Sequence, residues 1–211
     1  MLIGDDDGLK PGFFERLNRI NFEFRKPDVI YSSILQFFHP GVAPWKREGY
    51  VSEIRNGFFF LGRDEPFMLD AATRRKAVEN SLDNRRGFTF NMQAFIFKRE
   101  FLDKMRMDGK VFQSPFPDYY LANVAFAIAD TVVAVPESLA IAGVSRASFG
   151  FTLFNKLEKK GADLLKTDYD ADFAYQELKE SLLPGKSYTS SYIMTMLHVC
   201  KRLGSWTKVR P

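Results

Sequence analysis

Hydrophobic residues recur at helical spacing near the start of the chain. They are Phe13, Leu17, Ile20 and Phe24. The spacings of four, three and four positions are typical of one apolar helix face. Pro11 stands where such a helix would begin. We therefore expect a helix that starts near Pro11 and ends at Pro27.

Short apolar runs rich in aromatic and β-branched residues predict strands. These runs are residues 29–31, 57–61, 94–97 and 131–135, and we expect Pro136 to end the last one. Proline and glycine are frequent between the first two runs, which predicts a loop there. The loop residues concerned are Pro40, Gly41, Pro44 and Gly49.

Further helices are expected between and after these strands. They cover residues 70–82, 98–107, 119–129, 151–160, 172–183 and 190–203. Asp70 suits an N-cap, and residues 119–129 are apolar nearly all round, which indicates a buried helix. Expected helix stops are Gly161, Pro184-Gly185 and Gly204. The pattern predicts an α/β domain over residues 1–157 and a helical C-terminal extension over 158–211.

Composition favours a folded protein in a reducing compartment. The chain is 45% hydrophobic and carries 30 basic against 26 acidic residues, a net charge of +4. The basic residues lie in scattered clusters, so we expect no nucleic-acid partner. Cys200 is alone, which excludes an intrachain disulfide, and no apolar run reaches the roughly 18 residues of a membrane span. We expect no signal peptide, because the start turns acidic at once, and a cytoplasmic location.

Aromatic residues make up 15% of the chain, and 22 residues are Phe. This fraction suits a groove that binds sugars or bases, and it equally suits a core rich in Phe. We favour the core, because aromatic side chains dominate the cores of ordinary proteins.

Three consecutive carboxylates follow a short apolar stretch, residues 1–3, that reads as the end of a strand. Side chains two positions apart on a strand share a face, so Asp5 and Asp7 would point together and Asp6 away. Two carboxylates on one face can hold Mg²⁺ or Mn²⁺, which take oxygen ligands. The alternative is an acidic cap for the helix that begins near Pro11.

Three sets of motifs give the chain a resemblance to a known family. The first is Gly4-Asp5-Asp6-Asp7-Gly8 followed by Pro11-Gly12. The second is Phe97-Lys98-Arg99-Glu100-Phe101-Leu102, Gly109-Lys110-Val111-Phe112 and Pro117-Asp118-Tyr119-Tyr120-Leu121. The third is Val135-Pro136-Glu137-Ser138-Leu139, Gly143-Val144-Ser145 and Ser148-Phe149-Gly150. In this order they resemble the DXD segment, acceptor segment and later motifs of family-2-like bacterial glycosyltransferases with the GT-A fold.

The resemblance implies a partial GT-A-like, Rossmann-like mixed sheet and an inverting sugar transfer. The donor would be a nucleotide-diphosphate sugar, and the acceptor a hydroxyl-bearing glycan or lipid-linked molecule. Carried over by motif, Asp7 would be the principal metal ligand, Asp5 would assist through the ribose or the ion, and Asp118 would be the catalytic base. Asp6 and Arg146 would contribute to donor binding, although a solvated loop position is the alternative for Arg146.

Elementary electrostatics supports part of the role implied for Asp118. This residue comes just before an expected helix, whose N-terminal dipole would favour the ionised form that a base needs. The alternative is a simple N-cap. Pro117 stands where many family members carry Glu, and the Gln/Arg-x-x-Arg-Trp box of processive members is absent around Trp206. We therefore expect no processive synthesis.

In the GT-A fold the nucleotide-binding strands and helices precede the DXD segment, and here nothing precedes it. We expect the chain to be the metal- and acceptor-side part of a longer or split enzyme, or to work with a second polypeptide that supplies the nucleotide half. A peripheral association with the inner face of the membrane is left open.

Two rival functions stay open. One is a non-catalytic interaction module derived from a glycosyltransferase. The other is a phosphatase of the haloacid dehalogenase type, in which Asp5 would be the nucleophile and Asp7 the acid/base. Leu9 stands where that family usually has Thr or Val.

Overall fold

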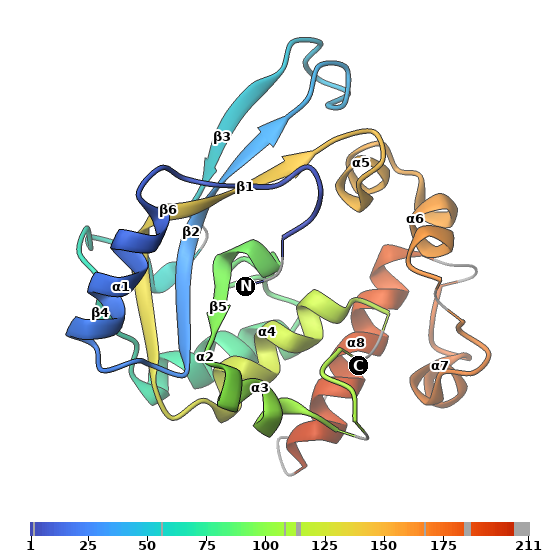
Figure 1. Ribbon diagram of the computed structural model, residues 1–211. Helices are drawn as coiled ribbons and strands as arrows, with labels where there is room; N and C mark the ends of the chain where they lie inside the picture. Colours follow the sequence, from blue (N-terminus) through green and yellow to red (C-terminus); the bar gives the residue numbers. More distant parts are fainter. Residues whose placement is uncertain are drawn as a thin grey trace.

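The chain folds into a mixed, curled β-sheet flanked by helices (Figure 1). The computed structural model describes residues 1, 3–55, 57–107, 109–112, 115–166, 168–183 and 187–204. The expected α/β class, with a mixed sheet between helices, is confirmed.

Two long parallel strands form the centre of the sheet. They are β2 (Val29–Phe38) and β6 (Val132–Val144). The shorter strands are antiparallel to them: β3 (Tyr50–Ile54) and β5 (Phe95–Phe97) pair with β2, and β1 (Gly8–Leu9) and β4 (Phe67–Met68) pair with β6. Both central strands are mostly buried, which explains why their sequences are apolar runs.

Helices cover the two faces of the sheet unequally. On one face α1 (Phe13–Glu23) packs Phe13 and Ile20 against Ile30 and Val133. On the other face lie α2 (Ala71–Leu82), α4 (Pro117–Ile128) and α8 (Tyr188–Leu203), which share the larger apolar core. The remaining helices are α3 (Arg99–Met105), α5 (Phe149–Phe154), α6 (Glu158–Leu164), α7 (Phe173–Leu178) and the short 3₁₀ turns η1 (Phe58–Phe60) and η2 (Met92–Ala94).

Tyr31 of β2 lies at the centre of the larger core. Its ring contacts Phe59, Phe60, Phe88, Phe95 and Phe126. The Tyr31 hydroxyl accepts a hydrogen bond of 2.9 Å from the backbone N–H of Thr89, so its polar atom is satisfied inside the core. Burial raises the pKa of Tyr31. These aromatic side chains form a core, as the composition predicted.

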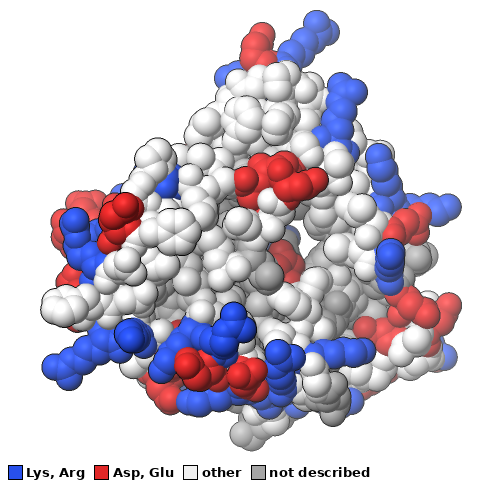
Figure 2. All heavy atoms as spheres, in the orientation of Figure 1, with Lys and Arg blue, Asp and Glu red and all other residues white. Residues whose placement is uncertain are grey.

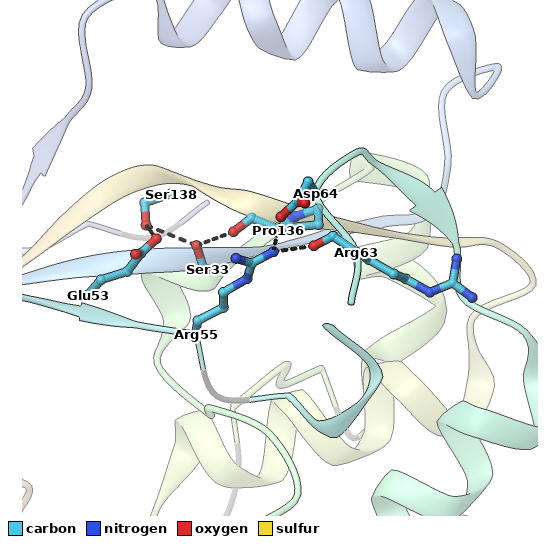
Figure 3. Close-up of polar contacts among 7 residues, drawn as sticks. All are labelled: Ser33, Glu53, Arg55, Arg63, Asp64, Pro136 and Ser138. Atoms are coloured by element: carbon cyan, nitrogen blue, oxygen red, sulfur yellow. Dashed lines mark hydrogen bonds and ion pairs between the residues drawn. The ribbon is translucent and has the colours of Figure 1, made fainter. Parts of the chain in front are cut away.

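Strand β6 does not end at Pro136, so that prediction is wrong. The pairing with β2 shifts register here, because Ser32 lies opposite Val135 and Ser33 opposite Ser138. The Ser33 hydroxyl donates a 2.7 Å hydrogen bond to the carbonyl of Pro136 and lies 2.9 Å from the Ser138 hydroxyl (Figure 3). A bulge tolerates a residue without an N–H, so the strand continues past the proline.

Residues 57–61 were expected to form a strand, and this expectation is also wrong. Phe58–Phe60 is the short helix η1, and the rings of Phe59 and Phe60 are buried against Tyr31. Turning the chain brings both neighbouring rings to the core, whereas a strand would point them to opposite faces.

The expected helix over 151–160 is two helices, α5 and α6. The chain turns between them, where Lys156 has a left-handed φ of 56°. Gly161 was expected to stop a helix but lies inside α6. A Cβ there would be 2.7 Å from the Thr152 hydroxyl and 2.9 Å from that of Tyr188, so close packing explains the glycine.

The apolar stretch before the carboxylates is not the end of a strand in the described residues. Met1 and Ile3 lie outside any strand, and Leu2 is outside the described residues. Strand β1 comes after the acids, at Gly8–Leu9.

Helix α8 contributes Tyr192, Met196, Val199 and Cys200 to the larger core, so the last helix packs with the sheet domain. The division between residues 1–157 and 158–211 stays a prediction. Pro184-Gly185, an expected helix stop, lies outside the described residues. Among the helices that the structure describes, none is long and apolar enough to span a bilayer.

Candidate functional site

A cavity of about 860 Å³ lies between the end of β6, the loop before β5 and the start of α4. Its walls include Asp6, Asp7, Gln93, Asp118 and Gly143, with aromatic side chains from several loops between them. Figure 2 shows acidic atoms both at the edge of a hollow on this face and inside it.

The acidic turn is anchored by backbone and amide N–H groups. Asp7 accepts hydrogen bonds from the N–H of Gly4 (2.6 Å), the side-chain amide of Gln93 (2.6 Å) and the N–H of Gly143 (2.9 Å). Asp6 accepts one of 3.1 Å from the N–H of Ser145. These donors hold the acidic turn against β6 and η2.

Asp5 does not share a face with Asp7, contrary to the expectation. Asp5 and Asp6 lie in a turn, so the alternation of a strand does not apply. Asp6 and Asp7 line the cavity, whereas Asp5 is exposed and is not among the described residues that line it. The geometric pair is therefore Asp6 with Asp7.

The turn fits against β6 only because residue 143 is glycine. A Cβ on Gly143 would lie 1.8 Å from the carbonyl oxygen of Asp6, which no side chain can do. Its N–H also holds Asp7, so this close approach fixes the acids relative to the central sheet.

Asp118, in the first turn of α4, also lines the cavity. The N-cap of this helix is Phe116, so the alternative in which Asp118 is the N-cap is wrong. Its carboxylate accepts a 3.0 Å hydrogen bond from the N–H of Tyr119.

Burial raises the pKa of Asp118 to about 6, although the N–H of Tyr119 and the charge of Arg86 act in the opposite direction. We expected the helix dipole to favour the ionised form, but desolvation is the larger effect. At neutral pH the group is ionised and can still accept a proton.

Sequence reasoning missed two polar side chains that line the same cavity. Arg86 lies over the rings of Tyr119 and Tyr192, with its guanidinium carbon 5.6 and 5.9 Å from their centroids. Gln93, in η2, holds Asp7. The only signal in the sequence was the Arg85-Arg86 pair, which reads as a solvated face.

Arg146 lies apart from this group. It is exposed, and it is not among the described residues that line the cavity. One of its guanidinium nitrogens lies 3.1 Å from where a Cβ on Gly41 would be, so it rests against the loop after β2. Arg55 does line the cavity, but it already bonds the carbonyl of Arg63 and the carboxylate of Asp64 (Figure 3).

Asp6 and Asp7 carry the oxygen ligands that a hard divalent cation prefers. Both residues line the cavity, and three N–H donors occupy three of the four lone-pair positions of Asp7. Among the described residues no group of three or more His, Cys, Asp or Glu side chains is gathered as a metal site. A cation here would need phosphate or water oxygens to complete its coordination.

Comparisons with protein-family models, with curated proteins and with solved structures find no match for this chain. The resemblance to family-2-like glycosyltransferases therefore stays an expectation that rests on the motifs alone.

Proposed function

We propose that this chain carries the metal- and acceptor-side part of a glycosyltransferase site. Asp118 would take the proton of an acceptor hydroxyl, and Asp6 and Asp7 would hold a divalent cation that binds the diphosphate of the donor. The observation that carries this proposal is that Asp7 and Asp118, far apart in the sequence, line one cavity.

The chemistry is a single displacement at the anomeric carbon of the donor sugar. The acceptor oxygen forms a bond to that carbon, the bond to the diphosphate oxygen breaks, and the nucleoside diphosphate leaves with the bonding electrons. The acceptor proton goes to Asp118, whose pKa of about 6 suits a base at neutral pH. A bound cation would supply charge to stabilise the departing diphosphate.

Neutral substitutions of two residues that line the cavity test this proposal. Asp7→Asn should lower Mn²⁺-dependent binding of uridine, guanosine or thymidine diphosphate at least about tenfold, measured by calorimetry. Asp118→Asn should keep that binding and lose about 10²-fold or more in release of nucleoside diphosphate from the matching sugar donor. In the unaltered chain, activity should fall with a midpoint near pH 6 as the pH is lowered, because Asp118 becomes protonated.

Glu180→Gln, an exposed charge elsewhere on the surface, is the matched control and should change neither readout. If the unaltered chain binds neither Mn²⁺ alone nor a nucleoside diphosphate with Mn²⁺, the sugar-transfer proposal fails and an interaction module becomes the better interpretation. Full release activity in Asp118→Asn would remove Asp118 as the base.

The phosphatase alternative gains no support from the geometry. It requires a nucleophilic Asp5, whereas the exposed Asp5 lies outside the described lining of the cavity.

A further inference from the structure

Two phenylalanines project into solvent from the outer side of α1. Phe14 is 66% exposed and Phe22 is 89% exposed. Together with exposed Asn18 they are spaced four residues apart, so they form one stripe along the helix. The opposite side of α1 is buried through Phe13 and Ile20. The fold therefore buries one face of this helix and leaves the other largely in solvent, where Phe14 keeps only an edge contact with the Phe13 ring, at 5.2 Å between centroids, among the ring contacts of the described residues.

Cations surround the C-terminal end of this stripe. Arg25 and Lys26 follow α1 in a tight turn in which both have a φ of 56°. The start of α3 lies beside this turn, because the N–H of Lys98 donates a 2.9 Å hydrogen bond to the carbonyl of Asp28. Figure 2 shows basic atoms, with acidic atoms between them, along the lower edge of the molecule. The exposed cations of this edge are Arg19, Arg25, Lys26, Lys98 and Arg99.

These cations are available to a ligand. Among the described residues none of them has a carboxylate within ion-pair distance. Arg16, in contrast, is engaged by Glu137. The nearby acids are Glu15, Glu23, Asp28 and Glu100, four against the five cations, so the edge is net positive by one charge.

We propose that α1 docks on the surface of a bilayer that contains anionic lipids. Phe14 and Phe22 would enter the boundary between headgroups and acyl chains, and the cations would contact anionic headgroups. A protein partner is less suited, because a stable interface buries about 800 Å² on each side, far more than two side chains offer. None of the described residues lining the cavity belongs to α1, so docking leaves the cavity open. This inference does not depend on sugar transfer.

Vesicle co-sedimentation of the full chain tests the proposal. Binding is compared on vesicles of phosphatidylcholine alone and on vesicles with about one third phosphatidylglycerol. We expect binding to the anionic vesicles only, weakening as salt is added. The double variant Phe14→Asn/Phe22→Asn should lower this binding at least about tenfold. Arg25→Gln/Lys26→Gln should lower it about fivefold for each cation removed.

Matched controls test whether vesicle binding requires this surface, or only exposed apolar side chains and positive charge anywhere on the molecule. Val51→Asn/Leu183→Asn removes two apolar side chains of 57% and 59% exposure elsewhere, and Lys159→Gln/Lys160→Gln removes two cations of α6. Both controls should bind like the unaltered chain. Circular dichroism should be unchanged in the Phe variants and the urea midpoint should fall only slightly, because Phe22 is 89% exposed and Phe14 loses an edge contact with Phe13.

Three results would overturn the proposal. The first is no binding of the unaltered chain to the anionic vesicles. The second is equal binding by the double Phe variant. The third is a dimer, seen by light scattering, that the Phe variants dissociate while vesicle binding is absent, which would assign the stripe to self-association.

Discussion

Asp118 illustrates how one residue's surroundings decide its chemistry. Its place in the first turn of a helix predicts a carboxylate that ionises easily. The cavity wall removes water from it, and this desolvation raises its pKa to about 6. The free energy of unfolding is therefore lower when Asp118 carries the negative charge that the proposed mechanism needs.

That cost gives a stability prediction for Asp118→Asn. The folded pKa is about 6 against an ordinary value of 3.8, so the fold disfavours the carboxylate. The penalty is absent below pH 3.8, grows as the pH rises, and is complete above about pH 6. At pH 7 the variant should gain roughly 3 kcal/mol in free energy of unfolding, and near pH 4 less than about 1 kcal/mol.

Urea unfolding at the two pH values measures this difference, and Glu180→Gln again serves as the control. A variant that is no more stable than the unaltered chain at pH 7 would show that water reaches Asp118 freely.

The structure also shows a pair of partly buried side chains, His198 and Asp172, that the sequence did not indicate. His198 of α8 lies 2.9 and 3.0 Å from the two oxygens of Asp172, which also caps α7 through the N–H of Ala174. Burial alone would raise the pKa of Asp172, but the hydrogen bond and charge of His198 outweigh it and lower the pKa. His198 therefore links α8 to the N-terminus of α7.

At the scale of elements, the acidic turn and the end of β6 behave as one unit. Gly143 lets the carbonyl of Asp6 approach the strand, and the Gly143 N–H holds Asp7. Any change that separates the two should affect both the fold and the acids.

Gly143→Ala should therefore cost about 1–3 kcal/mol of unfolding free energy, because its Cβ would overlap the carbonyl of Asp6. It should also weaken Mn²⁺-dependent nucleotide binding, because Asp6 and Asp7 would shift. Chemical denaturation and calorimetry measure the two effects. Gly8→Ala is the matched control, because its nearest neighbour outside the adjoining residues is the Cβ of Ile141 at 4.0 Å.

Elements with local signals were predictable from the sequence. The periodic apolar residues predicted α1. The Thr73 N–H donates a 2.8 Å hydrogen bond to Asp70, which matches the expected start of α2. Gly204 ends α8, as expected. The errors lie where distant contacts decide. The bulge at Pro136 depends on Ser33, more than a hundred positions earlier, and η1 forms because its rings pack on Tyr31.

The residues of the candidate site also fall into two groups: some could be selected from the sequence, and others are found only from the fold. Asp7 and Asp118 stand in recognisable motifs and could be selected before the structure was known. Gln93 and Arg86 carry no motif, and only the fold shows that they line the same cavity. Asp5 shows the opposite error, because a strand pattern was applied to residues that form a turn.

At the scale of the whole molecule, the last helix belongs to the core. Tyr192, Met196 and Val199 pack in the larger apolar cluster with α4 and the sheet. The Tyr192 hydroxyl also donates a 2.8 Å hydrogen bond to the carbonyl of Ser81 at the end of α2. Removing α8 would expose the apolar side of α4.

A chain shortened to residues 1–157 should therefore lose cooperative unfolding, which thermal denaturation followed by circular dichroism measures against the full chain. The reason is that a buried helix such as α4 needs α8 to cover it. Cooperative unfolding of the shortened chain would instead support an independent domain over residues 1–157.

The pairing of β2 with β6 has a consequence for the order of events during synthesis. Ser33 and Pro136, bonded across these strands, are 103 positions apart, and the pairing extends to Val144. The nascent chain can pair β2 with β3 and β5 early, but its other edge stays open until most of the chain has left the ribosome. Non-local pairing of this kind closes slowly, so this edge of β2 stays open to mispairing while the chain emerges.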